Sequence, residues 1–371
     1  MKKTWALAWI LALFLGLTAC QDKPVPQKVT LPTQQASETV SPAGSVVGVC
    51  IPDNTERWKT DVEVLTRELQ SLGYEVAVEY AAGDPATQIY QVDKLVEQKV
   101  CCLVVAPVDS LALVETQKKA EDAGIPVIAY DRLLMDAPGV DAFVTFDYVK
   151  MGQEMGSYIV QQKLLDTAAA EQRSYTIEFY MGSADDNSAF LLHTGILSVL
   201  QPYLDAGVLV CASGRTSFAD TYVLQASPVK AAEKLSNCLS SAYGERPLDI
   251  ICFGTDEMAV DCVELLASFG YDGENQPLIV SQGGSLVGAN AVLQGRIAMT
   301  VYKDNVELAQ NAARIANALI TRQTPEYNDA GQFHNHVVTV PAWVCPAFPV
   351  DSTTCWSLLV ETGVYSESDF T

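Results

Sequence analysis

Polar and aromatic side chains follow one strand-like run after another in this sequence, at positions where a folded chain could hold a ligand. Arg57 and Trp58 come soon after the first run, at residues 45–51. Asp131 and Arg132 directly follow the fourth run. In an open parallel sheet, ligands bind beyond the carboxyl ends of the strands, so these side chains should converge on one site. The candidate ligand-binding residues are Arg57, Trp58, Asp131, Arg132, Asp186, Asn187, Asp256, Gln282 and Lys303.

These residue types suit an uncharged ligand that carries several hydroxyl groups. Each hydroxyl both donates and accepts a hydrogen bond, and planar charged groups hold it well. An aromatic ring such as Trp58 can pack on the apolar face of a sugar ring. The alternative is that Arg57 and Arg132 only cap helices or pair with acidic residues at the surface, where such pairs are common and weak. The repetition of polar residues after six strands favours a shared ligand site.

Catalytic and metal chemistry have little support in the sequence. His193 lies on a predicted helix, and His334 and His336 lie in a polar connection, so none has the spacing that a metal site requires. No nucleophile elbow, phosphate loop or metalloprotease helix is found. We therefore expect no catalytic residue, no metal ion and no cofactor. The formal net charge of -22 also argues against a nucleic-acid partner, since phosphate binding needs a basic surface.

The segments that must position these residues alternate between two patterns. Short apolar runs are followed by longer runs with helical periodicity, such as residues 57–72, where Val62, Leu65 and Leu69 share one stripe. This alternation predicts a mostly parallel sheet covered on both faces, and because it starts again after residue 146, we predict an α/β fold with two doubly wound parallel-sheet lobes. The strand-like runs are residues 45–51, 75–80, 101–106, 126–130, 142–146, 175–181, 209–211, 249–254, 277–281 and 298–302.

The first residues predict export and lipid attachment. Lys2 and Lys3 precede an apolar run that is too short for a comfortable membrane span. Small residues before Cys20 match a lipoprotein cleavage site, so residues 1–19 are the predicted signal and Cys20 the predicted site of acylation. The alternative is an ordinary signal peptide with a chance cysteine near its end. In either case the protein is expected to lie outside the cytoplasm.

Residues 20–44 predict a disordered tether between this lipid and the folded chain. The segment is rich in Pro, Gln, Ser and Thr and has almost no bulky apolar residues, so it cannot bury enough surface to offset chain entropy. Lipid on Cys20 would then anchor the protein to the cell membrane.

Nine further cysteines are spread over the chain. Cys101 and Cys102 lie in an apolar run, where a small buried side chain is favoured over a bond or a metal ligand. Cys345 and Cys355 are close enough in sequence for a disulfide. The pairing stays open at this stage.

Several short motifs together resemble one family, the xylose-binding and multiple-sugar-binding periplasmic proteins. The likeness runs over residues 46–321, which is most of the chain after the tether. The motifs are Glu56-Arg57-Trp58, Tyr130-Asp131-Arg132, Thr145-Phe146-Asp147, Gly182-Ser183 with Asp186-Asn187, Thr255-Asp256, and Met299-Thr300-Val301-Tyr302-Lys303.

This resemblance implies the class I periplasmic-binding-protein fold, in which three segments cross between two lobes. The crossings are expected near Thr145, Tyr302 and Val337. The N-terminal lobe would then comprise residues 45–146 and 304–336, and the C-terminal lobe residues 147–303 and 337–371. The resemblance further implies that sugar hydroxyls are held by Arg57, Arg132, Asn187, Asp256 and Lys303, and that Trp58 packs on the ring.

Two departures from the family pattern concern ligand identity. Relatives carry an aspartate where Gly283 stands, so a strong hydroxyl acceptor is lost. Residues 214–227 form a longer segment than expected and lack the family's tryptophan, for which Phe218 or Tyr222 could substitute. The expected ligand is therefore a monosaccharide such as xylose, glucose or a related aldose.

The resemblance also implies partners. The closed, ligand-bound form would be recognised by an ABC permease paired with its ATPase, and the protein is expected to act as a monomer. The alternative is a sensor that presents the closed form to a chemoreceptor or a histidine kinase. An enzyme is a further alternative, for which the sequence offers no catalytic group.

Overall fold

The computed structural model describes residues 44–244 and 246–370. The predicted signal peptide, the acylation site at Cys20 and all but the last residue of the predicted tether lie outside the described residues. Within the described part of the chain, no helix combines the length and the apolar character needed to cross a bilayer.

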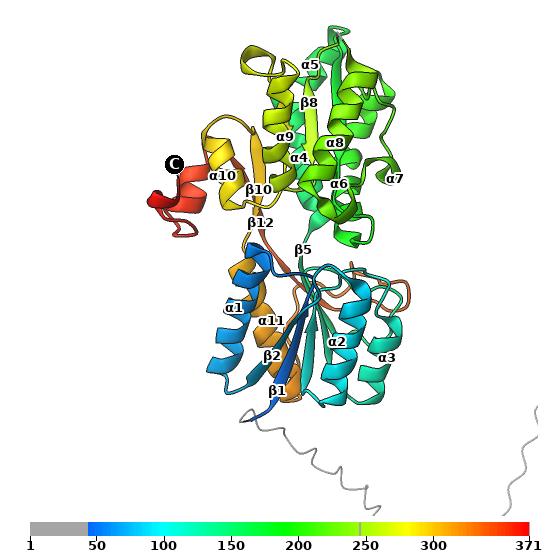
Figure 1. The fold of residues 1–371 in the computed structure, drawn as a ribbon, viewed down its shortest axis with the longest axis vertical. Coiled ribbons are helices and arrows are strands. Elements are labelled where there is room, and N and C mark those ends of the chain that lie inside the picture. The colour runs from blue at the N-terminus through cyan, green and yellow to red at the C-terminus, as the bar shows by residue number, and fades with distance from the viewer. Residues whose placement is uncertain (1–43, 245, 371) are drawn as a thin grey trace, which may run out of the picture. The chain divides into compact units, whose positions relative to one another are not determined.

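The first of two six-stranded sheets has the strand order β11-β5-β4-β3-β1-β2, and all its pairings are parallel. Helices α1 and α11 pack together on one face, and α2 and α3 pack together on the other (Figure 1). The strands are β1 (Val46–Ile51), β2 (Glu75–Tyr80), β3 (Cys102–Val105), β4 (Val127–Tyr130), β5 (Ala142–Phe146) and β11 (Ala342–Cys345). The helices are α1 (Glu56–Ser71), α2 (Pro85–Glu97), α3 (Val114–Asp122) and α11 (Asn305–Ile320).

The second sheet has the order β12-β10-β9-β8-β6-β7 and is parallel except for the antiparallel pair of β10 and β12. Its strands are β6 (Tyr175–Tyr180), β7 (Leu209–Val210), β8 (Ile250–Phe253), β9 (Leu278–Val280), β10 (Met299–Lys303) and β12 (Ala347–Asp351). Its helices are α4 (Tyr148–Gln162), α5 (Leu165–Ala170), α6 (Asn187–Asp205), α7 (Phe218–Thr221), α8 (Pro228–Cys238), α9 (Asp256–Ser268) and α10 (Leu286–Leu293). Short helical turns lie at Leu224–Ala226, Leu239–Tyr243, Gly273–Asn275, Trp356–Val360 and Glu367–Asp369.

Local sequence explains where these elements form. Every residue of β3 and β4 is buried, as parallel strands covered on both faces require, and both strands are apolar throughout. Helix α2 begins with Pro85 at its first position, and the Asp84 carboxylate accepts the Thr87 N–H as a cap. Asp186 caps α6 in the same way. The predicted α/β fold with two doubly wound lobes is confirmed.

The chain crosses between the two sheets three times. It leaves the first sheet after β5 and returns to it after β10, beside the predicted positions Thr145 and Tyr302. The third crossing was expected near Val337, but β11 pairs with β5 in the first sheet, so the chain crosses after Cys345. Residues 337–345 therefore belong with the first sheet.

The three crossing segments lie side by side. Cys345, the last residue of β11, is paired with Phe146, the last residue of β5. Ala347, the first residue of β12, is paired with Lys303, the last residue of β10. Only Pro346 separates the strand of one sheet from the strand of the other.

Helices α4 and α6 approach each other closely through two glycines. A Cβ atom on Gly152 would collide with the backbone carbonyl of Leu192, and one on Gly195 would collide with the carbonyl of Val149. Glycine is needed at both positions because the two backbones touch here.

All nine cysteines in the described residues are free. Cys345 packs in the core beneath α1, α4, α6 and α11, whereas Cys355 packs in a separate core with α8, α9 and α10. The disulfide considered between them is therefore not formed.

Candidate functional site

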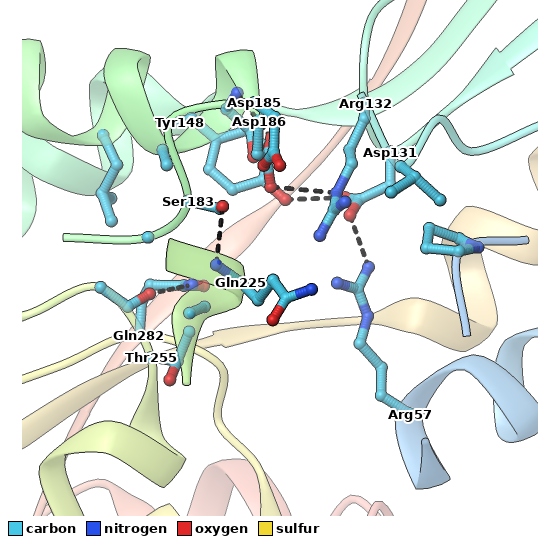
Figure 2. A pocket seen from close by; sticks show the side chains of 18 of the residues that line it. Arg57, Asp131, Arg132, Tyr148, Ser183, Asp185, Asp186, Gln225, Thr255 and Gln282 are labelled. Atoms are coloured by element: carbon cyan, nitrogen blue, oxygen red, sulfur yellow. Dashed lines mark hydrogen bonds and ion pairs between the residues drawn. The ribbon is translucent and has the colours of Figure 1, made fainter. Parts of the chain in front are cut away.

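A cavity of about 150 Å³ lies between the two lobes, beyond the carboxyl ends of strands from both sheets (Figure 2). Pockets for drug-sized ligands usually measure about 300–1,000 Å³, so this one suits a smaller molecule. The charged side chains that line it are Asp53, Arg57, Asp131, Arg132, Asp185, Asp186 and Lys303.

A chain of charged hydrogen bonds forms the floor of this cavity. Arg57 Nη2 donates to Asp131 Oδ2 at 2.7 Å, and the Tyr148 hydroxyl donates to Asp131 Oδ1 at 2.7 Å. Lys303 Nζ in turn donates to the Tyr148 oxygen at 3.3 Å. Asp131 belongs to the first lobe, while Tyr148 and Lys303 belong to the second. This series of hydrogen bonds therefore joins the two lobes.

Burial and neighbouring charges shift the pKa values of the acidic and basic groups in this floor. Burial opposes the charge on Asp131, but Arg57, Lys303 and the two hydrogen bonds outweigh it and hold the pKa of Asp131 well below its usual range. Burial and the nearby Arg57 charge lower the pKa of Lys303 to about 8. Asp61 is buried next to Arg57, and burial raises the pKa of Asp61 to about 7.

A second link between the lobes lies at the edge of the cavity. Arg132 Nε lies 2.9 Å from Asp186 Oδ2, and this ion pair joins the loop after β4 to the start of α6. The other carboxylate oxygen of Asp186 accepts hydrogen bonds from the backbone and hydroxyl of Ser188, which fixes its orientation. The backbone N–H of Ser110 donates to the carbonyl of Asp185 across the same gap. The two walls of the cavity are thus already in contact.

The wall formed by the second lobe carries uncharged polar groups. Gln282 Nε2 donates to the Gly254 carbonyl at 2.6 Å, and Oε1 of the same side chain has no hydrogen-bond partner among the described residues. Ser183, Gln225 and Thr255 also line the cavity. Beside the charged Asp185, Asp186 and Lys303, this wall therefore also offers uncharged donors and acceptors.

A family model described as a periplasmic binding protein domain matches residues 47–324. This chain belongs to the periplasmic binding protein family. The resemblance to sugar-binding periplasmic proteins is confirmed by two relatives that align over most of their length. The multiple sugar-binding periplasmic receptor ChvE of Rhizobium radiobacter is 33% identical, covering 86% of this chain and 90% of its own. The D-xylose-binding periplasmic protein of Escherichia coli is 29% identical, covering 87% and 92%.

A solved structure of similar shape is an ABC transporter solute binding protein from Clostridium phytofermentans with bound β-D-glucose. It has a TM-score of 0.84 and 29% identity, and the match covers 88% of this periplasmic binding protein and 100% of that chain. A carbohydrate transporter solute binding protein from Chloroflexus aurantiacus, in complex with D-glucose, has a TM-score of 0.77 and 27% identity, with 88% and 98% covered. The relatives and the fold are those of solute-binding proteins, so this chain is not an enzyme.

The cavity brings together six of the nine residues singled out from the sequence of this periplasmic binding protein, while Trp58, Asn187 and Asp256 do not line it. Asn187 is the first residue of α6, next to the lining residues Asp186 and Ser188. The six lining residues are Arg57, Asp131, Arg132, Asp186, Gln282 and Lys303.

Trp58 lies in the hydrophobic core, 3% exposed. The guanidinium of Arg57 lies 4.2 Å from the centre of its ring, and that of Arg132 lies 5.7 Å from it. Trp58 therefore supports two lining arginines through cation–π contacts instead of presenting a face to a ligand ring.

Asp256 is fully buried and serves the fold. Its Oδ1 accepts from the hydroxyls of Ser281 and Thr300, both at 2.6 Å, and its Oδ2 accepts the Ser285 N–H at 2.9 Å. It also explains Gly283, since a Cβ there would lie 2.9 Å from Asp256 Oδ2 on a backbone with φ of +141°. The neighbouring Thr255 lines the cavity in its place.

Several polar lining residues were not among the nine candidates, and Tyr148 and Gln225 belong to none of the motifs noted in the sequence, whereas Thr255 belongs to the motif Thr255-Asp256. Tyr148 begins the helix after the first crossing, a position that could have been recognised. Phe218 and Tyr222, considered as aromatic substitutes, do not line the cavity; the Phe218 ring packs against Tyr222 and His193. Within the described residues, no group of three or more His, Cys, Asp or Glu side chains could hold a metal ion.

Proposed function

We propose that this chain binds a monosaccharide in the interlobe cavity, as the solute-binding component of an ABC importer. The ligand would be xylose, glucose or a related aldose. The names of its relatives support the class of ligand, because those proteins bind xylose, multiple sugars or glucose.

The observation that carries the proposal is the balance of charge in the cavity. Three cations, Arg57, Arg132 and Lys303, line the cavity together with four carboxylates, and two of the cations already pair with carboxylates, Arg57 with Asp131 and Arg132 with Asp186. An anionic ligand would meet the carboxylates, and a cationic one would meet the three cations. An uncharged molecule with several hydroxyls can donate to the carboxylates and accept from the cations at once.

Closure of the two lobes would couple binding to transport. A ligand that contacts both walls stabilises only the form in which the walls face each other across it. In the proposal, this closed form is recognised by the ABC permease and its ATPase. The protein acts as a monomer and lies outside the cytoplasm, as the names of its periplasmic relatives suggest. Lipid on Cys20 holds it at the cell membrane.

The test is a thermal shift titration of the purified protein with D-xylose, D-glucose and related aldoses. A ligand at a hundred times its dissociation constant adds about 2.7 kcal/mol of stability if it binds only the folded state. Arg132→Ala should abolish the shift, because Arg132 lines the cavity. Arg173→Ala is the matched control, since Arg173 pairs with Glu171 at the surface. No shift with any aldose would refute the proposal.

A second candidate is a sugar sensor that presents the closed form to a chemoreceptor or a histidine kinase. The Rhizobium relative is named a periplasmic receptor, which supports this second candidate. Deleting the gene separates the two: loss of growth on the sugar supports an importer, and loss of a response to the sugar with growth intact supports a sensor.

A further inference from the structure

One segment at the cavity holds an unusual backbone. In the turn Leu224–Ala226, Gln225 has φ of +59° and Ala226 has φ of +46°. Side chains with a Cβ rarely adopt this left-handed conformation, and two successive non-glycine residues in it are rarer still. Such strain persists only where the surrounding structure fixes it, and it gathers at binding sites.

The surroundings of the turn fix it in place. The backbone N–H of Gln225 donates to Ser183 Oγ at 2.9 Å, so the turn is attached to the loop after β6. The Ala226 N–H donates to the Val223 carbonyl at 2.9 Å, and the Val223 N–H donates to the Met181 carbonyl at 3.1 Å. The strained residues therefore lie between two anchored points.

The left-handed backbone of this turn sets the direction of the Gln225 side chain. Figure 2 shows Gln225 extending into the cavity between Gln282 and Arg57. Its amide makes no hydrogen bond among the described residues, whereas Arg57 is already paired with Asp131 and Gln282 with Gly254. An amide has both donors and an acceptor, which is what a hydroxyl group requires.

We propose that Gln225 is a specificity-determining residue, which hydrogen-bonds one hydroxyl of the bound sugar from the second lobe. This inference rests on the proposed function. It assigns the strained turn a role: the left-handed backbone aims the amide at the ligand. A sugar that lacks the contacted hydroxyl gains nothing from Gln225.

The decisive variant is Gln225→Gly. Glycine adopts positive φ without strain, so the melting temperature of the unliganded protein should stay the same or rise. The affinity for the best-bound aldose of the panel should fall about fivefold to tenfold, as for the loss of one neutral hydrogen bond. Because the two effects run in opposite directions, misfolding cannot mimic the result. Leu224→Ala, at an exposed neighbour that does not line the cavity, is the matched control.

Monodeoxy derivatives of that aldose complete the experiment, with affinity measured by titration calorimetry. The derivative that lacks the contacted hydroxyl should bind wild type and Gln225→Gly equally, while the other derivatives should still favour wild type. If Gln225→Gly binds every sugar as tightly as wild type does, the inference is wrong and the proposed function stands. If wild type binds no aldose at all, the proposed function fails and the inference fails with it.

Discussion

Replacing Asp61 by asparagine should stabilise the protein at mildly alkaline pH and remove part of its pH dependence. Asp61 is 1% exposed, and neither carboxylate oxygen accepts a hydrogen bond among the described residues. Its ion-pair contact, with Arg57 Nη2, measures 3.8 Å, whereas the same nitrogen lies 2.7 Å from Asp131. Burial therefore raises the pKa of Asp61 to about 7, although the Arg57 charge opposes this.

The sign of the effect follows from proton binding. A carboxyl whose pKa is higher in the folded state binds more protons when folded, so stability falls as pH rises between its unfolded and folded pKa values. For Asp61 this window runs from 3.8 to about 7. At about 1.4 kcal/mol per pKa unit, ionising Asp61 costs on the order of 4 kcal/mol in the wild type and nothing in the variant. Asp131 and Lys303 titrate below and above this window.

Urea unfolding of the unliganded protein at several pH values between about 4 and 8 measures this difference. The free energies of unfolding of wild type and Asp61→Asn should be similar near the acid end and diverge as pH rises, with the variant more stable. Asp205→Asn, at the surface, is the control and should follow wild type. A gap between wild type and Asp61→Asn that stays constant over the whole range would refute the reasoning.

Two further substitutions test the supports of the cavity. Gly152→Ala should cost several kcal/mol of stability, since the new Cβ would collide with the Leu192 carbonyl and force α4 away from α6. A melting temperature equal to that of wild type would contradict the close contact between these helices. Tyr365→Phe removes the hydroxyl that donates to the Gly284 carbonyl at 2.9 Å, next to the loop that carries Gln282. It should cost about 1 kcal/mol in urea unfolding and leave the m-value unchanged, whereas no measurable loss would show that the C-terminal segment does not support this loop.

Much of the cavity could be predicted because a parallel sheet places its ligand at the carboxyl ends of its strands. That rule alone locates Arg57, Asp131, Arg132 and Lys303. It does not say which of two adjacent residues faces the ligand. Arg57 and Trp58 are successive residues of α1, about 100° apart around the helix, so one lines the cavity and the other lies in the core.

Other features depend on contacts that the sequence does not reveal. Gln225 follows no periodic pattern, and glutamine is not a residue that normally marks a left-handed turn. The role of Asp256 depends on hydroxyls from Ser281 and Thr300, which come from two other strand ends. The position of the third crossing depends on the pairing of β11 with β5, across almost 200 residues of sequence, which local pattern does not show.

In the proposed closure, the adjacent crossings would act as the pivot. Phe146 is paired with Cys345 within the first sheet, and Lys303 with Ala347 within the second, so a change of lobe angle would leave both pairings intact. The short connection through Pro346 opposes translation of one lobe past the other. Tyr148 and Lys303 both belong to the second lobe, so the contact between them would survive a change of lobe angle. Arg132 and Asp186 lie on opposite lobes, so in the proposed movement their separation would change with that angle. The distance between two labels placed beside Arg132 and Asp186 would measure how far the two lobes are open.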